Sequence, residues 1–192
     1  MCKPALHGAR SLNRYAAALR EIRRVQIFAI SGSLRAESAN TALLRAIRRL
    51  APDGVAIDLF DALEQMPPFN PDCETEAAPS SVAALRAHLK ACDAFLVSTP
   101  EYAHGVPGVL KNALDWVVGS GELYEKPVAI LQTSAERGQF ALASLKETLA
   151  VIGTRLVCEV TLLPPQAGEE SHLAQFISAL VNEVQKALQR GM

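Results

Sequence analysis

The chain has 192 residues, 49% of them hydrophobic, and its Lys, Arg, Asp and Glu side chains leave a formal net charge of -1. This length and apolar content predict one sizeable domain with a buried core. The near-neutral charge argues against nucleic acid or an anionic membrane surface as a partner, because neither is attracted without an excess of positive charge.

The cysteines and the hydropathy exclude further classes of protein. Four cysteines, at positions 2, 73, 92 and 158, are scattered without a CxxC pair or a Cys/His cluster. This spacing indicates neither a zinc site nor a disulfide framework, and it suits a reducing compartment. No apolar run approaches the ~20 residues that span a bilayer, and no secretory signal precedes the first strand. We therefore expect a cytoplasmic protein without a metal site.

Residues 1–24 differ in composition from the rest of the chain. They carry seven basic residues, counting His7, and one acidic residue. We expect an N-terminal extension here, either an exposed arm or a short helix, followed by a single domain over residues 25–192. An Arg-rich leader address is the alternative interpretation.

Apolar runs typical of strands alternate with helical patterns along this domain. The strand-like runs are Val25 to Ser31, Val55 to Phe60, Ala94 to Thr99, Val128 to Thr133 and Leu156 to Leu163. Apolar residues at helical spacing predict helices over residues 43–50, 82–92, 109–117, 140–152 and 173–188. Pro79 to Ser81 suit the start of the second helix, and Gly153 suits the end of the fourth.

This alternation predicts an α/β fold with one open sheet. The interior runs AFLVS and VAILQ are apolar at nearly every position, as in parallel strands covered by helices on both faces. Val55, Ile57 and Leu59 instead alternate with smaller or polar residues, which indicates an edge strand. Residues 63–79 contain four prolines and are expected to form a connecting loop over the surface.

The segment GSLRAESAN, Gly32 to Asn40, follows the first strand directly. Its hydroxyls, the Arg35 guanidinium and the amides that lead into a helix N-terminus describe a cradle for a phosphate. The alternative is that Ser38 or Asn40 only caps the helix. Neither GxxxxGK[ST] nor GxGxxG is present, so a nucleoside triphosphatase or a dinucleotide-binding fold lacks its signature.

The segment STPEYAHGVPGVLKNALDW, Ser98 to Trp116, follows the third strand. Together with GSLRAESAN it resembles the NADPH-dependent FMN reductase family, which includes quinone, chromate, azo and nitro-compound reductases. The resemblance runs in order from about Val25 to Leu163. It implies a flavodoxin-like three-layer sandwich, with a five-stranded parallel sheet in the order 2-1-3-4-5 and helices on both faces.

The resemblance also implies the residues that bind FMN. In the first loop, those at the phosphate would be Ser31, Ser33, Arg35, Ser38 and Asn40. In the second, those along the isoalloxazine, mainly through backbone groups, would be Pro100, Glu101, Tyr102, Ala103, His104 and Gly105. In the third, QTSAERGQF, those bordering the flavin would be Thr133, Ser134, Arg137 and Gly138. Many members have Asn in place of Ala103 and more glycine in the third loop, so only a backbone contact is inferred at Ala103.

Three side chains of this set have two interpretations. His104 is either a proton donor to a reduced quinone or flavin, or a loop histidine that fills space or faces solvent. Glu101 either acts as a base or orients its turn. Arg137 either meets a phosphate of the nicotinamide cofactor or faces solvent. No protein side chain is assigned as catalytic, because flavin N5 would carry the chemistry.

The implied function is hydride transfer from NADPH or NADH, through non-covalently bound FMN, to a quinone or similar small acceptor. The alternatives are a reductase that releases reduced FMN to a monooxygenase, a flavodoxin-type electron carrier, and a flavin-binding regulatory protein. The resemblance implies a homodimer or homotetramer as well. The apolar stripe from Val109 to Val118 is then either a subunit interface or part of the core.

Overall fold

The computed structural model describes residues 24–74, 78–134, 136–164 and 170–190. The N-terminal extension expected for residues 1–24 lies outside this range apart from Arg24. The elements in chain order are β1 (Val25–Ser31), α2 (Ala39–Arg49), β2 (Val55–Phe60), the 3-10 turns η2 (Leu63–Gln65) and η3 (Pro71–Cys73), α3 (Ser80–Ala91), β3 (Ala94–Ser98), α4 (Gly108–Val118), β4 (Pro127–Gln132), α5 (Gln139–Ile152), β5 (Arg155–Thr161) and α6 (Ser171–Arg190).

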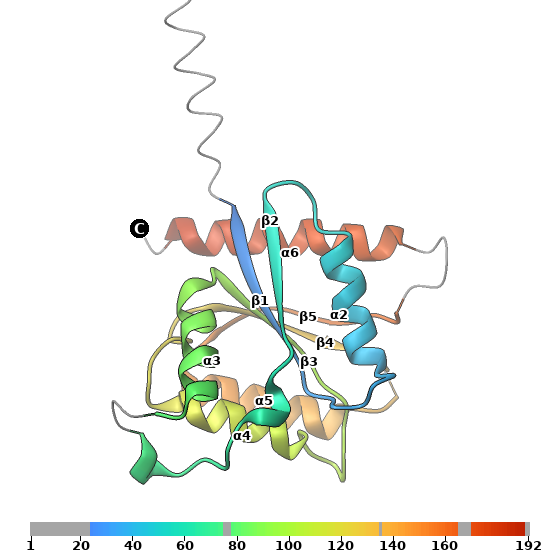
Figure 1. Cartoon of the computed structure of the whole chain (residues 1–192). Coiled ribbons are helices and arrows are strands. Elements are labelled where there is room, and N and C mark those ends of the chain that lie inside the picture. Colours follow the sequence, from blue (N-terminus) through green and yellow to red (C-terminus); the bar gives the residue numbers. More distant parts are fainter. Residues whose placement is uncertain (1–23, 75–77, 135, 165–169, 191–192) are drawn as a thin grey trace, which may run out of the picture.

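The strands form one parallel sheet in the order β2-β1-β3-β4-β5. Helices α2 and α6 cover one face, and α3, α4 and α5 cover the other (Figure 1). The predicted three-layer fold and strand order are therefore confirmed, and β2 is an edge strand as expected. Among the described residues, no helix has the length and apolar character needed to cross a membrane.

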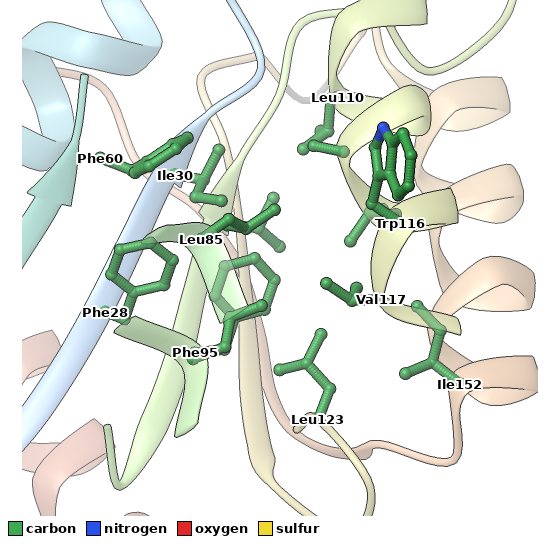
Figure 2. Close-up of a cluster of buried hydrophobic side chains, with 14 of the residues drawn as sticks. Phe28, Ile30, Phe60, Leu85, Phe95, Leu110, Trp116, Val117, Leu123 and Ile152 are labelled. Carbon is green, nitrogen blue, oxygen red and sulfur yellow. The ribbon is translucent and has the colours of Figure 1, made fainter. Parts of the chain in front are cut away.

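The alternation of side chains along the strands builds two separate cores. Phe28 and Ile30 of β1 pack with Phe95 of β3 under α3, α4 and α5 (Figure 2). Ile27 and Ala29 point the opposite way and pack under α2 and α6. Because both faces of the central strands are buried, these strands are apolar at almost every position.

Strand ends differ from the expectations by one or two residues. Strand β3 ends at Ser98 because Thr99 already turns into Pro100, with the Thr99 hydroxyl donating to the Pro100 carbonyl at 3.0 Å. Strands β4 and β5 each begin one residue earlier than predicted, at Pro127 and Arg155. Helix α5 ends as expected at Gly153, whose φ of 81° is open to glycine at little cost.

The loop after β2 is more than a surface connection, which corrects the expectation for residues 63–79. The side chains of Leu63 and Met66 are buried in the core. The Pro67 carbonyl accepts hydrogen bonds from Asn112 Nδ2 at 2.8 Å and from Trp116 Nε1 at 2.9 Å. Helix α4 therefore holds this loop through the side chains of Asn112 and Trp116. The sequence alone gives no sign that these side chains bond to Pro67.

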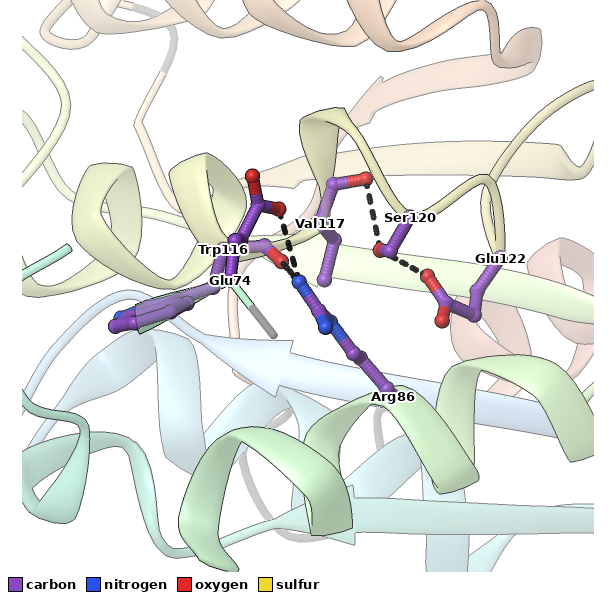
Figure 3. A network of polar contacts seen from close by, with 6 residues as sticks. All are labelled: Glu74, Arg86, Trp116, Val117, Ser120 and Glu122. Atoms are coloured by element: carbon purple, nitrogen blue, oxygen red, sulfur yellow. Dashed lines mark hydrogen bonds and ion pairs between the residues drawn. The ribbon is translucent and has the colours of Figure 1, made fainter. Parts of the chain in front are cut away.

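Arg86 of α3 also contacts α4 and the loop after β2. Its guanidinium donates to the Trp116 carbonyl, at 2.6 Å from Nη2, and pairs with Glu74 at 3.0 Å (Figure 3). Beyond the end of α4, Ser120 bonds to the Val117 carbonyl and to Glu122. These contacts fix the C-terminal end of α4 against α3 and the loop.

The stripe from Val109 to Val118 is core rather than interface over most of its length. Leu110, Ala113, Leu114 and Val117 are buried against the sheet, and Val118 is the exposed member. The interpretation of this stripe as a subunit interface is therefore wrong for its inward-facing residues.

Candidate cofactor site

The loops after β1, β3 and β4 emerge at one edge of the sheet, as parallel strands require. Ser31 and Ser98 are partners in register at the ends of β1 and β3. Gly32, the first residue beyond β1, donates its N–H to the Ser98 carbonyl at 2.8 Å. The first and second loops therefore start side by side.

The serine hydroxyls of the first loop accept hydrogen bonds from its own backbone. The N–H of Ser33 donates to Ser31 Oγ, that of Arg35 to Ser33 Oγ, and that of Thr41 to Ser38 Oγ, each at 3.3 Å. A hydroxyl that accepts from an amide keeps its own proton to donate. Three buried serines can thus donate to an anion beside the N-terminus of α2, where the helix dipole also favours negative charge.

Ser38 and Asn40 have different structural roles. Ser38 is the N-cap of α2, so the capping interpretation holds for it, while its hydroxyl proton remains a donor. Asn40 is buried in the first turn, and its Oδ1 accepts from Ser98 Oγ at 2.8 Å. Its Nδ2 is the donor left for a ligand.

A cavity of about 210 Å³, with both polar and apolar walls, lies beside the first loop. Its polar lining consists of hydroxyls, two guanidinium groups and two carboxylates, from Ser31, Ser33, Thr41, Arg35, Arg45, Asp61 and Glu64. The hydroxyls of Ser31 and Ser33 and the two guanidinium groups suit a phosphate ester, whereas the carboxylates of Asp61 and Glu64 repel an anion on their side of the cavity. Thr41 and Arg45 were not predicted for the site; they lie one turn apart on α2 and so reach the same cavity.

A more apolar cavity of about 520 Å³ adjoins the first one, and Leu34 and Arg35 line both. Its other walls are Gly32, Tyr102, Pro107, Gly108 and Val109. An open, mostly apolar space bordered by a half-exposed tyrosine suits a planar ring system. Of these residues, only Arg35 and Tyr102 were predicted for the site. The sequence signals for the others were the GSLR segment, which contains Gly32 and Leu34, and the VPGV segment, which contains Pro107, Gly108 and Val109.

The turn Tyr102 to Gly105 has a strained backbone. Tyr102 and Gly105 exchange two backbone hydrogen bonds, of 3.1 and 3.0 Å, as the ends of a two-residue hairpin. The central residues Ala103 and His104 have φ values of 49° and 58°. These are the signs of a type I′ turn, which Asn and Gly adopt more readily than alanine or histidine.

We expect the substitution Ala103→Asn to raise the free energy of unfolding of the flavin-free protein by about 0.5–1 kcal/mol, because asparagine tolerates a positive φ better than alanine. Denaturant titration followed by circular dichroism measures this change. Ala103→Val is the matched control, and it should lower stability because a β-branched residue is disfavoured there. Asparagine that stabilises no more than valine would contradict this account of the turn.

Two side chains connect this turn to α5. Glu101 Oε2 accepts from the N–H groups of Phe140 and Ala141 at 2.8 and 2.9 Å. The ring of His104 stacks on that of Phe140 with centroids 4.3 Å apart. Glu101 therefore caps the helix and connects it to the second loop, and His104 packs on an aromatic ring.

We expect Glu101→Ala to lower the free energy of unfolding by about 1–2 kcal/mol, because the first amides of α5 lose their cap. Gly138, the residue before α5, has no side chain to replace it. Glu101→Gln should lose less, since an amide oxygen still accepts. Glu147→Ala, on the exposed face of the same helix, is the control and should change stability by under about 0.5 kcal/mol. Equal losses from Glu101→Ala and Glu147→Ala would refute the cap.

The described residues of the third loop are not part of the walls of the two cavities. Thr133, Ser134, Arg137 and Gly138 line neither cavity. The Arg137 side chain is exposed, and its N–H donates to Ser134 Oγ at 3.2 Å. Gly138 has a φ of 114°, and an added Cβ would lie 2.8 Å from Gln132 Nε2. The backbone conformation and the close contact both favour glycine at position 138, directly before α5.

This architecture, a five-stranded parallel sheet in the order 2-1-3-4-5 with a serine-rich loop and an apolar cavity at its carboxyl edge, defines a flavodoxin-like protein. Residues 25–168 match the family described as NADPH-dependent FMN reductase. The chain belongs to this family.

Individual relatives and a solved structure agree. An NAD(P)H-dependent FMN reductase of Pseudomonas aeruginosa is 39% identical over 132 residues, which are 67% of this chain and 71% of that protein. A probable NADPH:quinone oxidoreductase of rice is 44% identical over 96 residues, 48% of this chain and 47% of that one. The flavoenzyme NAD(P)H:acceptor oxidoreductase of Paracoccus denitrificans superposes with a TM-score of 0.70 at 29% identity, covering 85% of this chain and 98% of that one.

Proposed function

We propose that this protein is an FMN-dependent NAD(P)H oxidoreductase that reduces quinones or similar small acceptors. The observation that carries the proposal is the contact between the two cavities, because FMN joins a phosphate to a flat apolar ring through a short polyol. The donors of the first loop and the apolar space beside Tyr102 match these two ends. When bound, FMN supplies the hydride-accepting and electron-donating chemistry.

The residues divide between the two ends of the flavin. Ser31, Ser33, Arg35, Ser38 and Asn40 hold the phosphate, with Arg45 adding positive charge. The backbone from Pro100 to Gly105 borders the ring edge, while Tyr102, with 48% of its surface exposed, and Leu34 border the open side where a second planar molecule stacks. Thr133, Ser134, Arg137 and Gly138 border the flavin from the third loop, which leads into α5, the helix that Glu101 bonds to the second loop.

The quinone acceptor is supported by the relatives. Proteins named quinone reductase from Pseudomonas putida and Escherichia coli are 38% and 33% identical to this chain, with 61% of each of those proteins covered. An exposed tyrosine next to an apolar cavity favours flat acceptors of modest size. A flavodoxin-type electron carrier usually needs a strongly acidic docking surface, which a net charge of -1 does not supply.

Anaerobic stopped-flow spectroscopy tests the proposal. Flavin absorbance is followed as NADPH or NADH is mixed with the FMN-loaded protein, and a benzoquinone is then added. Rapid bleaching followed by rapid quinone-driven return of colour is expected. Flavin that neither nucleotide bleaches would favour the carrier or regulatory alternative. Reduced flavin that dissociates before the quinone reacts would favour a reductase that supplies a monooxygenase.

We also propose that residues 25–192 form the reductase domain, that it assembles as a homodimer or homotetramer, and that it works in the cytoplasm. Exposed apolar side chains on the outer surface of α5 and β5, Val151 and Leu156, support an assembly because they remain uncovered in the single chain. Light scattering coupled to gel filtration gives the mass, and a mass of about one chain would overturn the assembly.

A further inference from the structure

Ser98, the last residue of β3, touches both ends of the first loop. Its carbonyl accepts from the N–H of Gly32, where the loop begins, at 2.8 Å. Its hydroxyl donates to Oδ1 of Asn40, where the loop enters α2, also at 2.8 Å. The Ser98 side chain is 0% exposed, so no water competes for either bond.

The bond from the Ser98 hydroxyl also holds the Asn40 amide in place, with Oδ1 toward β3 in this structure. Because Oδ1 of Asn40 accepts from Ser98, Nδ2 is the end of the amide that can donate to an anion. A second bond, between the hydroxyls of Thr41 and Ser31 at 2.8 Å, ties the next residue of α2 to β1. The first turn of α2 is therefore attached to two adjacent strand ends by side chains.

We propose that Ser98 is a positioning residue for the phosphate of FMN, acting through Asn40 and the first loop without touching the cofactor. This inference rests on the proposed function. It also makes Ser98 the link between the two ends of the flavin, because the turn that borders the ring, Pro100 to Gly105, starts two residues later. In the sequence, Ser98 is only the first residue of the segment from Ser98 to Trp116, and no role was predicted for it.

Removing the hydroxyl leaves Asn40 Oδ1 buried without its donor and frees the amide to rotate. Ser98→Ala should therefore raise the dissociation constant for FMN about tenfold, the effect of one lost buried hydrogen bond. Riboflavin has the same ring system without the phosphate, so its affinity should change less than about twofold. The preference of the protein for FMN over riboflavin falls accordingly.

The experiment titrates the flavin-free protein with FMN and with riboflavin, following the quenching of flavin fluorescence. Ser98→Cys, nearly the same size with a weaker donor, should lie between the wild type and Ser98→Ala. It also keeps the test possible if the alanine variant does not fold. Thr154→Val is the matched control, because it removes a hydroxyl bond, 3.0 Å from Thr154 to the Leu149 carbonyl, at the opposite edge of the sheet. It should change neither affinity.

A double substitution tests the path through Asn40. In an Asn40→Ala background, Ser98→Ala should alter the FMN preference by less than about twofold, since the two side chains act as one unit. A folded Ser98→Ala protein that loses affinity for both flavins equally, or an undiminished effect in the Asn40→Ala background, would overturn the inference and leave the proposed function intact. A wild-type protein that binds neither flavin would overturn both.

Discussion

Replacing Gly32 with alanine is expected to weaken FMN binding by about tenfold to a hundredfold. A Cβ at this position would lie 2.7 Å from Thr99 Oγ1 and 2.9 Å from Leu110 Cδ2, closer than real Cβ contacts. Leu110 is fully buried and Thr99 lies at the base of the second loop, so neither yields without moving structure around the site. Overpacking of this kind lowers the free energy of unfolding by about 1–3 kcal/mol. We expect the first loop to shift in order to relieve the clash.

Two measurements separate an effect on the first loop from an effect on the stability of the whole fold. Flavin titration gives the affinity, and denaturant unfolding of the flavin-free protein gives the stability. Gly108→Ala is the matched control, because Gly108 lines the same apolar cavity but an added Cβ would meet nothing within 4 Å. Gly108 is the first residue of α4, and alanine has a higher helix propensity than glycine. Gly108→Ala should therefore leave the free energy of unfolding unchanged or raise it by under about 1 kcal/mol. Similar losses of stability in both variants would refute the steric argument.

Trp116→Ala should cost about 3–5 kcal/mol of the free energy of unfolding, the usual effect of truncating a large buried aromatic residue. Trp116 is 1% exposed, and its ring meets Phe69 edge to face at a centroid distance of 5.1 Å. Its loss opens a cavity between α4 and the loop after β2. Circular dichroism during urea unfolding measures the change.

Trp116→Phe distinguishes packing from hydrogen bonding. Phenylalanine keeps an aromatic ring, and the Pro67 carbonyl keeps the bond from Asn112 Nδ2 when the indole N–H is gone. The loss should therefore be about 1–2 kcal/mol. If phenylalanine were as damaging as alanine, the indole hydrogen bond would be the main contribution of Trp116, contrary to this prediction.

The strands and helices could be predicted because their signals are local, whereas the strand order was implied by the family resemblance. Runs such as AFLVS and VAILQ are apolar throughout since both of their faces are buried, and that pattern is typical of parallel strands between helices. The loop after β2 was predicted incorrectly for a related reason. Its prolines indicate irregular backbone, but a helix more than 40 residues further along supplies the bonds that bury it.

The site was predicted in part. The loop motifs indicated Ser31, Ser33, Arg35 and Tyr102, which line the cavities. Arg45, Pro107 and Val109 were missed because each belongs to a helix or its approach and becomes part of a wall only when the chain folds. The third loop was expected beside the flavin, yet its residues line neither cavity.

The sequence by itself determined the order of elements, the family and the three loops that meet at one edge of the sheet, because periodicity and contiguous motifs are properties of short stretches of chain. Only the tertiary structure decided which atoms face each other. The bond from Ser98 to Asn40 joins residues 58 apart, and the cap from Glu101 to Phe140 joins residues 39 apart. Such pairs are set by strand register and helix packing, which depend on the whole core.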